Sequence, residues 1–158
     1  MKKAIFAITV LFIITQISKA QSAKDEVLNL VVSLDNSIVK KDSLKIKSLL
    51  SEDFIGTIPT GESFSKVIYI RFHCRPNVGL ISINGIDKDK TSVRLYGNSA
   101  VVNRRIHVSK KAPDGSLRSF DVQRIEVCIQ QKGRWYIAAG QGTEVIYKWQ
   151  HISIIDPE

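Results

Sequence analysis

The sequence predicts an α+β fold, with helices in the first part of the chain and a mostly antiparallel sheet in the second. Up to about residue 73, apolar residues recur at spacings of three and four, which is the period of a helix. From about residue 80 they alternate, which is the period of a strand, and turn sequences separate the alternating segments. With 158 residues, 44% hydrophobic and 24% charged, the composition is that of a single globular domain.

The first twenty residues have the layout of a secretory signal peptide. Lys2 and Lys3 precede an apolar run at 4–14, and the small residues Ser18 and Ala20 follow it. This pattern is typical of a peptide cleaved after Ala20. The apolar run is shorter than the about 20 residues that cross a bilayer, so contact with a membrane is expected only during export. The sequence therefore predicts an exported protein, periplasmic or secreted.

The net charge of +8 changes once this segment is set aside. Cleavage would remove Lys2, Lys3 and Lys19 and no acidic residue, which leaves +5 on the remaining chain. The other basic residues are dispersed, and no run of five like charges occurs. Because nucleic-acid sites need a clustered basic stripe with aromatic platforms, we expect no nucleic-acid partner.

The two cysteines are read as separate buried thiols. Cys74 and Cys128 would meet an oxidising compartment after export. Their distance along the sequence, however, does not tell whether their geometry allows a disulfide bond. Pairing therefore stays open, and two small buried hydrophobes are the favoured reading. The sequence contains no C-x-x-C spacing of a redox or metal site.

The predicted domain spans 21–146, and its first half is expected to hold three helices and a short strand. The first helix shows apolar residues at spacings of 4, 3 and 4, with basic residues in its last turn. Asp42 or Ser43 can cap the second helix, and Ser63 or Ser65 can begin the third, which Pro76 ends. The segments are helix 23–41, helix 44–50, strand 54–59 and helix 64–73.

The second half is expected to form an antiparallel meander. Tight turns are predicted at Gly97-Asn98 and Lys132-Gly133, where glycine supplies the positive φ that such turns require. Residues 147–158 form a C-terminal tail that could add an edge strand or pack on a partner. The expected strands are 80–86, 91–96, 100–109, 117–129 and 135–145.

Several local motifs occur in an order that resembles a known superfamily. They are residues 48–54 (SLLSEDF), Gly61, residues 96–102 (YGNSAVV), residues 124–129 (RIEVCI) with 132–135 (KGRW), and residues 138–143 (AAGQGT). Their order is similar to that of the nuclear transport factor 2-like superfamily, which includes SnoaL-like polyketide cyclases and ketosteroid isomerases. The closest likeness is to an exported branch of unknown function. The resemblance implies a cone of curved sheet closed by about three helices, a pocket inside the cone, and a homodimer.

The last hairpin predicts which side chains face the inside of the cone. If Lys132-Gly133 is a two-residue turn, the opposed pairs are Gln131 with Arg134, Cys128 with Ile137, Glu126 with Ala139, and Arg124 with Gln141. The apolar residues Trp135, Ile137 and Ala139 are expected to point inward. Arg124, Glu126 and Gln141 would then point inward with them, whereas the alternate register would place them outside.

Two readings of this polar group remain open. In one, Arg124 and Glu126 form a structural ion pair and Gln141 completes its hydrogen bonds. In the other, the group is a polar floor, and Arg124 binds a carboxylate or carbonyl group of a ligand.

Catalysis is harder to assign. Ketosteroid isomerases place a carboxylate base just before the proline of the first strand, and Ile58 stands at that position here, which excludes that mechanism. Asp53 is read as a residue of the helix–strand junction and His73 as a surface residue at a helix end. The remaining candidates are Glu126, Asp121 and His107. The sequence leaves open on which face of its strand His107 lies.

The leading hypothesis is an exported protein that binds a small organic ligand, without an identifiable catalytic activity. Its ligand-binding candidates are Arg124, Gln141, Glu126, Trp135 and Phe54. One alternative is a lyase, isomerase or hydrolase that uses Glu126 or Asp121 as a base and Arg124 to stabilise an oxyanion. Another is an interaction module that dimerises through its outer sheet face. No cofactor and no metal are expected, because no nucleotide fingerprint or metal-ligand spacing is present.

Overall fold

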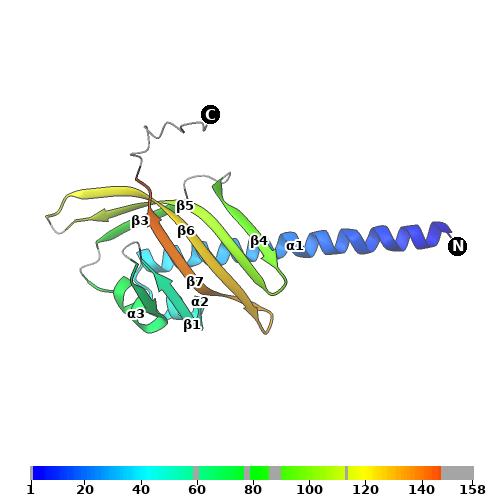
Figure 1. Ribbon diagram of the computed structural model, residues 1–158, viewed down its shortest axis with the longest axis horizontal. Coiled ribbons are helices and arrows are strands. Elements are labelled where there is room, and N and C mark those ends of the chain that lie inside the picture. The colour runs from blue at the N-terminus through cyan, green and yellow to red at the C-terminus, as the bar shows by residue number, and fades with distance from the viewer. Residues whose placement is uncertain (1, 59–60, 77–78, 86–89, 113, 147–158) are drawn as a thin grey trace, which may run out of the picture.

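The computed structural model describes residues 2–146 apart from 59–60, 77–78, 86–89 and 113, with side chains from residue 20 onward. It confirms the α+β class: the helices all lie against one face of a curved, open and mostly antiparallel sheet (Figure 1). The predicted tail, 147–158, lies outside the described residues. The three helices are α1 (Lys2–Val39), α2 (Ser43–Leu49) and α3 (Lys66–His73).

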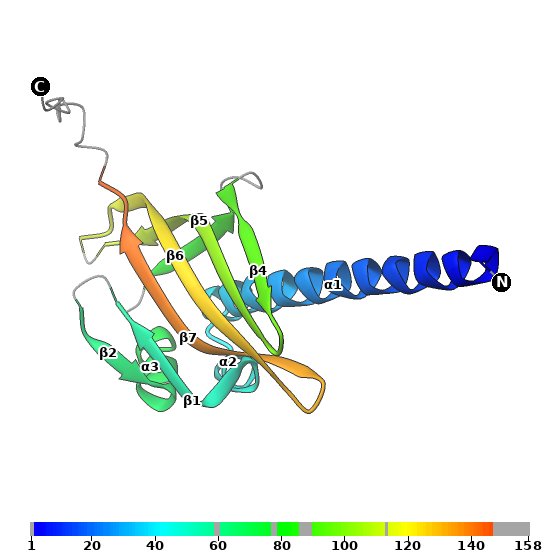
Figure 2. The same ribbon diagram turned by 45° about the vertical axis from the view of Figure 1, so that its right-hand side comes forward.

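Local sequence explains where the helices begin and end. The Asp42 side chain caps α2 by accepting a hydrogen bond of 2.9 Å from the backbone nitrogen of Lys45, as the sequence predicts. Ser65 is the N-cap residue of α3, although its side chain makes no capping bond. The first helix is longer than expected, because it runs through the predicted cleavage site. Its N-terminal part extends beyond the sheet in both views (Figure 1, Figure 2).

No helix among the described residues combines the length and the apolar character that a membrane crossing needs.

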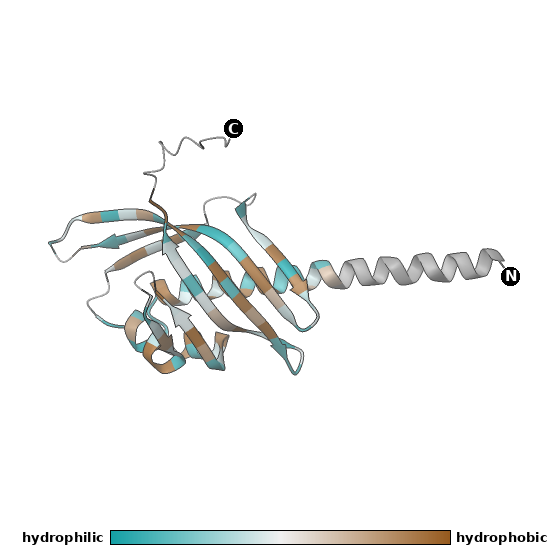
Figure 3. Ribbon diagram, in the orientation of Figure 1, coloured by the Kyte–Doolittle hydropathy of each residue, from teal (hydrophilic) through white to brown (hydrophobic). Residues whose placement is uncertain are grey.

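The sheet has the order β2-β1-β7-β6-β5-β3, and β4 also pairs with β5. All of these pairings are antiparallel except the one between β1 and β7. Buried and exposed residues alternate along the two longest strands, which Figure 3 shows as alternating bands of hydropathy. The strands are β1 (Leu50–Thr57), β2 (Ser63–Ser65), β3 (Leu80–Gly85), β4 (Ser92–Tyr96), β5 (Ser99–Lys111), β6 (Leu117–Gln131) and β7 (Arg134–Glu144).

The region around the first strand differs from the prediction in two ways. Strand β1 begins at Leu50, four residues before the predicted start at 54, and it has an irregular register between Leu50 and Ile55. A short strand, β2, precedes α3 and pairs with β1. Three residues are too few to produce a visible alternation, which explains why the sequence pattern does not reveal this strand.

The last hairpin forms where predicted but does not keep its register. Lys132 and Gly133 both have positive φ, 51° and 77°, as a tight two-residue turn requires. The pairing follows the prediction from Gln131 to Cys128 and then shifts by one residue. A β-bulge places two residues of one strand against one of the other, and such a shift reverses which face the following side chains occupy.

The shift corrects the predicted pairs beyond the bulge. Glu126 lies opposite Gly140, and Arg124 lies opposite Gly142, not opposite Ala139 and Gln141. Ala139 pairs with Val127, and Gln141 pairs with Ile125, which is 49% exposed. Ala139 and Gln141 therefore fall on the outer face. The glycines take the inner positions, where they leave room beside the two charged side chains.

A third glycine, on the neighbouring strand, continues this row of inner positions that have no side chain. Gly56 of β1 pairs with Gly140 of β7. A Cβ built on Gly56 would lie 2.7 Å from Cδ2 of Tyr69 and 3.0 Å from the ring of Phe54. The two rings pack edge to face, with centroids 4.9 Å apart. We refer to Gly56, Gly140 and Gly142 as the glycine strip.

The main core lies between α1 and the sheet. Helix α1 contributes Val27, Val31, Leu34 and Ile38, the apolar stripe that its sequence predicts, and all four are buried. A smaller cluster of Ile106, Val108 and Val122 lies further along β5 and β6. The larger cluster fills the space between α1 and one end of the sheet. Beside the smaller cluster, the space between the helices and the sheet is only partly filled.

Replacing Gly56 with alanine is expected to destabilise the fold by about 1–3 kcal/mol, because the new Cβ would overlap the Tyr69 ring in a packed core. Gly85→Ala is the matched control: it lies on a strand, has no positive φ, and its Cβ would have no neighbour within 4 Å. Urea unfolding of both variants measures the difference. Equal midpoints for the two variants would show that the close approach of Tyr69 is unimportant.

Candidate functional site

The helices and the inner face of the sheet enclose a cavity of about 320 Å³. Most of its wall is apolar, and the polar residues gather at two places that are described below. Glu144 borders the cavity and its side chain is 36% exposed, so the cavity reaches the surface there. The apolar residues of the wall are Leu34, Ile38, Phe54, Ile58, Phe72, Leu80, Ile83, Ile106, Val108, Phe120, Val122 and Ile137.

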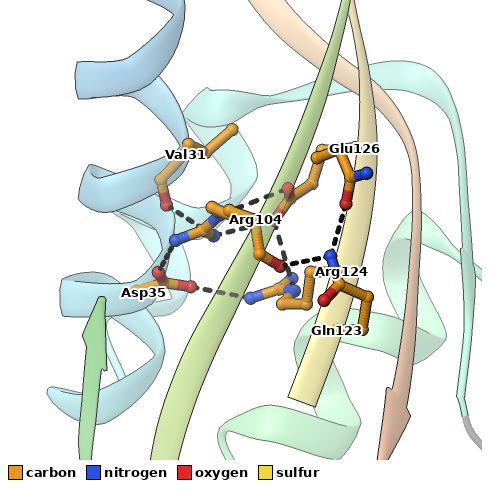
Figure 4. A network of polar contacts seen from close by, with 7 residues as sticks. Val31, Asp35, Arg104, Gln123, Arg124 and Glu126 are labelled. Atoms are coloured by element: carbon orange, nitrogen blue, oxygen red, sulfur yellow. Dashed lines mark hydrogen bonds and ion pairs between the residues drawn. The ribbon is translucent and has the colours of Figure 1, made fainter. Parts of the chain in front are cut away.

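Four charged side chains meet at the floor of the cavity, and we call them the charge network (Figure 4). They are Asp35 of α1, Arg104 of β5, and Arg124 and Glu126 of β6. Arg104 donates from Nη1 to Asp35 Oδ2 at 2.5 Å and from Nη2 to Glu126 Oε1 at 2.7 Å. Arg124 donates from Nη1 to Asp35 Oδ1 at 2.7 Å, and its Nε lies 3.2 Å from Glu126 Oε1.

The charge network is buried and electrically neutral. The exposed fractions of its side chains are 11% for Arg124, 6% for Asp35, 4% for Arg104 and 0% for Glu126. Burial by itself would lower the pKa of both guanidinium groups, but the two carboxylates overcome that effect and raise both pKa values. Each carboxylate contacts both guanidinium groups. Two positive and two negative charges therefore cancel within one cluster.

Two aromatic residues of α3, Tyr69 and His73, border the cavity beside the charge network. Burial raises the pKa of the Tyr69 hydroxyl, which also interacts with the Arg124 guanidinium. The ring of His73 stacks at a tilt on that of Tyr69, with centroids 4.4 Å apart. Burial, followed by the charge of Arg124, lowers the pKa of His73 to about 4. His73 is therefore neutral near pH 7 and offers one donor and one acceptor nitrogen.

A second polar group lies at the other end of the inner face, at the cavity mouth. Lys110 and Arg118 lie opposite each other on β5 and β6. Both sit over the ring of Phe120, with Nζ and Cζ each 5.2 Å from its centroid. Arg118 also donates to Glu144 Oε1 at 2.8 Å. Lys110, Phe120 and Glu144 border the cavity. We call Lys110, Arg118, Phe120 and Glu144 the mouth cluster.

The structure brings together only part of the predicted ligand-binding set. Arg124, Glu126 and Phe54 border the cavity. Gln141 is among the residues that border the cavity, but its strand position places its side chain on the outer face, away from the charge network. Trp135 is 6% exposed and belongs to the main core, outside the cavity wall; its Nε1 has no hydrogen-bond partner within the described residues. In the structure Trp135 therefore packs in the core and does not border the cavity.

The other predicted catalytic candidates lie on the outer face. His107 and Asp121 are paired across β5 and β6, and His107 Nδ1 lies 2.9 Å from Asp121 Oδ1. Their strand positions alternate with the buried Ile106 and Val122, so they point away from the cavity. Neither can act on a molecule bound inside. Ile58, at the position of the family's carboxylate base, borders the cavity as an apolar residue.

Sequence reasoning missed three residues of the floor. Asp35 lies on the same helical face as Val31 and Ile38, so its spacing contained the signal. Arg104 lies at the alternate position between Val102 and Ile106, both of which are buried, and shows the same kind of signal on a strand. His73 was expected at the surface, but the turn of α3 directs it toward the cavity.

The two cysteines are both free in the structure, Cys74 partly exposed and Cys128 fully buried. Burial raises the pKa of the Cys128 thiol to about 12, which suits a packing residue and not a nucleophile. Among the residues that the structure describes, no group of three or more His, Cys, Asp or Glu side chains could hold a metal ion.

No protein-family model and no curated protein sequence matches the chain. Solved structures do resemble it. An NTF2-like protein from Cytophaga hutchinsonii is 21% identical, with a TM-score of 0.68 over 77% of this chain and 97% of the other. A nuclear transport factor 2-like superfamily protein from Salmonella enterica serovar Typhimurium is 16% identical, with a TM-score of 0.70 over 88% and 99%.

The association domain of Caenorhabditis elegans CaMKII is also similar, with 16% identity and a TM-score of 0.65 over 78% of this chain and 96% of the other. Since the described chain also has helices packed on one face of an open curved sheet, it has the nuclear transport factor 2-like fold.

Replacing Asp35 with asparagine is expected to destabilise the protein by about 3–5 kcal/mol, because two buried guanidinium groups would share one carboxylate. Arg118→Met, which breaks the exposed pair with Glu144, should cost less than about 1 kcal/mol. Denaturant unfolding at pH 7 and low salt measures both. A loss below 1 kcal/mol for Asp35→Asn would mean that the charge network does not hold α1 on the sheet.

Proposed function

We propose that this protein is exported and binds a small organic molecule in the cavity, without catalysing a reaction on it. The observation that carries this proposal is the cavity itself: about 320 Å³, mostly apolar, with a few polar groups at its ends. Ligand sites commonly have volumes of about 300 to 1,000 Å³ and this kind of lining. The signal-peptide pattern of residues 1–20 supports export.

The charge network argues against catalysis by a carboxylate in the cavity. Both oxygens of Glu126 already accept hydrogen bonds from Arg104 Nε, at 3.2 Å each. A general base must be positioned to take a proton from its substrate, and these bonds hold the carboxylate toward Arg104 instead. The Asp35 oxygens are each bound to a guanidinium group as well. This polar group therefore suits the structural reading of Arg124 and Glu126, with Asp35 and Arg104 in place of Gln141.

The glycine strip offers a direct test of ligand binding. Gly140 has ordinary φ, and a Cβ there would meet only Glu126 Cγ, at 3.8 Å. In Gly140→Val the branched methyl groups would occupy cavity space. We expect a neutral apolar dye, N-phenyl-1-naphthylamine, to bind the wild-type protein saturably and to bind Gly140→Val at least about tenfold more weakly.

Ala139→Val is the matched control, because residue 139 is the adjacent position and faces outward. Fluorescence titration measures both variants, and thermal unfolding checks that they are folded. Dye binding that is absent from the wild-type protein, or that is equal in the two variants, would contradict the proposal. Native mass spectrometry of the purified protein would also detect a ligand that copurifies with it.

A second function, homodimerisation through the outer sheet face, is favoured by an apolar row there. Ile55, Ala139, Val127 and Val101 pair in sequence across β1, β7, β6 and β5. Ile55 is 54% exposed, and Ile125 beside the row is 49% exposed. An exposed apolar strip of this kind commonly marks an interface. The similarity to an association domain supports the same reading.

If this face forms the dimer, Ile125→Lys should weaken self-association at least about tenfold, because a charge at the interface would lose its water. Leu44→Lys is the control: Leu44 is 79% exposed on α2, on the opposite side of the sheet. Sedimentation velocity over a range of concentrations measures the dissociation constants. A wild-type protein that stays monomeric would exclude this function.

A further inference from the structure

We propose that the ligand is a small amphipathic anion, a monocarboxylate with an apolar body, whose carboxylate lies at the mouth cluster and whose body fills the cavity. This inference rests on the proposed ligand-binding function and specifies the ligand's chemical class and direction. Three observations carry it: the charges of the floor cancel, the mouth has one positive charge without a carboxylate partner, and the wall between them is apolar.

The floor of the cavity does not favour the binding of an anion. Arg124 is the only cation of the charge network that borders the cavity, and its Nη1 and Nε are already within reach of Asp35 and Glu126. A ligand carboxylate there would add a third negative charge to a neutral buried cluster. His73, neutral near pH 7, cannot supply the missing positive charge. A buried charge without a partner is strongly unfavourable.

The mouth is different, because it carries one positive charge without a carboxylate partner. Glu144 pairs with Arg118 at 2.8 Å. Lys110 has no carboxylate partner among the described residues, and its ammonium group sits over the Phe120 ring. The position of Lys110 alternates with the buried Val108 and Ile106, so its side chain lies on the inner face. An ammonium group there can receive a carboxylate at the cavity entrance, where the head group keeps part of its hydration.

The wall between the two ends suits a hydrocarbon. Ile106, Val108 and Val122 form a buried cluster next to the mouth, and Leu80, Ile83 and Phe120 pack against it. All six border the cavity. Each methylene group of a ligand that is buried there contributes about 0.8 kcal/mol. A ligand with its head group at Lys110 would therefore place its body along this wall and toward Tyr69.

The test uses three probes of equal length and different charge: octanoate, 1-octanol and octylammonium. Each displaces N-phenyl-1-naphthylamine from the full-length protein at pH 7. We expect octanoate to bind best and octylammonium worst. Lys110→Met should weaken octanoate binding at least about fivefold, since a hydrogen bond to a charged group is lost, and should leave 1-octanol binding unchanged.

Lys111→Met is the matched control. It removes the same charge from the adjacent residue, which is exposed and lies on the other side of the strand, so octanoate binding should not change. Equal binding of the three probes, or an unchanged octanoate affinity in Lys110→Met, would overturn this inference while leaving the proposed function intact. Failure of the dye and of all three probes to bind would instead overturn the proposed function.

Discussion

The position of α1 on the sheet depends on four buried charges that neutralise one another. Asp35 is the only member on the helix, and it joins Arg104 and Arg124 of two neighbouring strands. An unpaired charge at this depth would cost several kcal/mol, so the helix is held at the depth and rotation at which both guanidinium groups find their oxygens. Apolar packing alone is less directional and does not by itself define that depth and rotation. The charge network thus sets the position of α1, which contributes Leu34 and Ile38 to the cavity wall.

The same network also divides the cavity by polarity. Its floor is polar but neutral, and the stacked rings of Tyr69 and His73 lie in the cavity wall with Arg124 and Glu126. The mouth lies further along β5 and β6, where Lys110 is six residues beyond Arg104, and it carries Lys110 on an aromatic platform. Between them the wall is apolar. A molecule inside would therefore meet a gradient of environments along one axis, and this gradient gives it a preferred orientation as well as a place.

Sequence periodicity predicted the parts of the site that follow simple geometry. The Lys132-Gly133 turn correctly placed Arg124 and Glu126 on the inner face, because a two-residue turn sets the register of its hairpin. Gln141 was misplaced because an extra residue in β7 reverses the faces beyond it; the local signs of this bulge are Gly140 and Gly142, since a glycine inside a strand often marks one. The partners of Asp35 could not be predicted from local spacing. Helical spacing places Asp35 on the apolar face, but only the fold shows which side chains it contacts there.

The glycine strip has a consequence for how readily the shape of the cavity can change. Gly140 and Gly142 border the cavity, and where a residue has no side chain, each added carbon alters the shape of the pocket without moving the backbone. A Cβ on Gly140 has room, whereas one on Gly142 would press on Val122 at 3.1 Å. The size of residue 140 therefore sets the length of the free cavity, and alanine, serine or valine there would shorten it in steps. Under the proposed function, selectivity for ligand size would change through residue 140 alone, while the charge network, and with it the fold, stays the same.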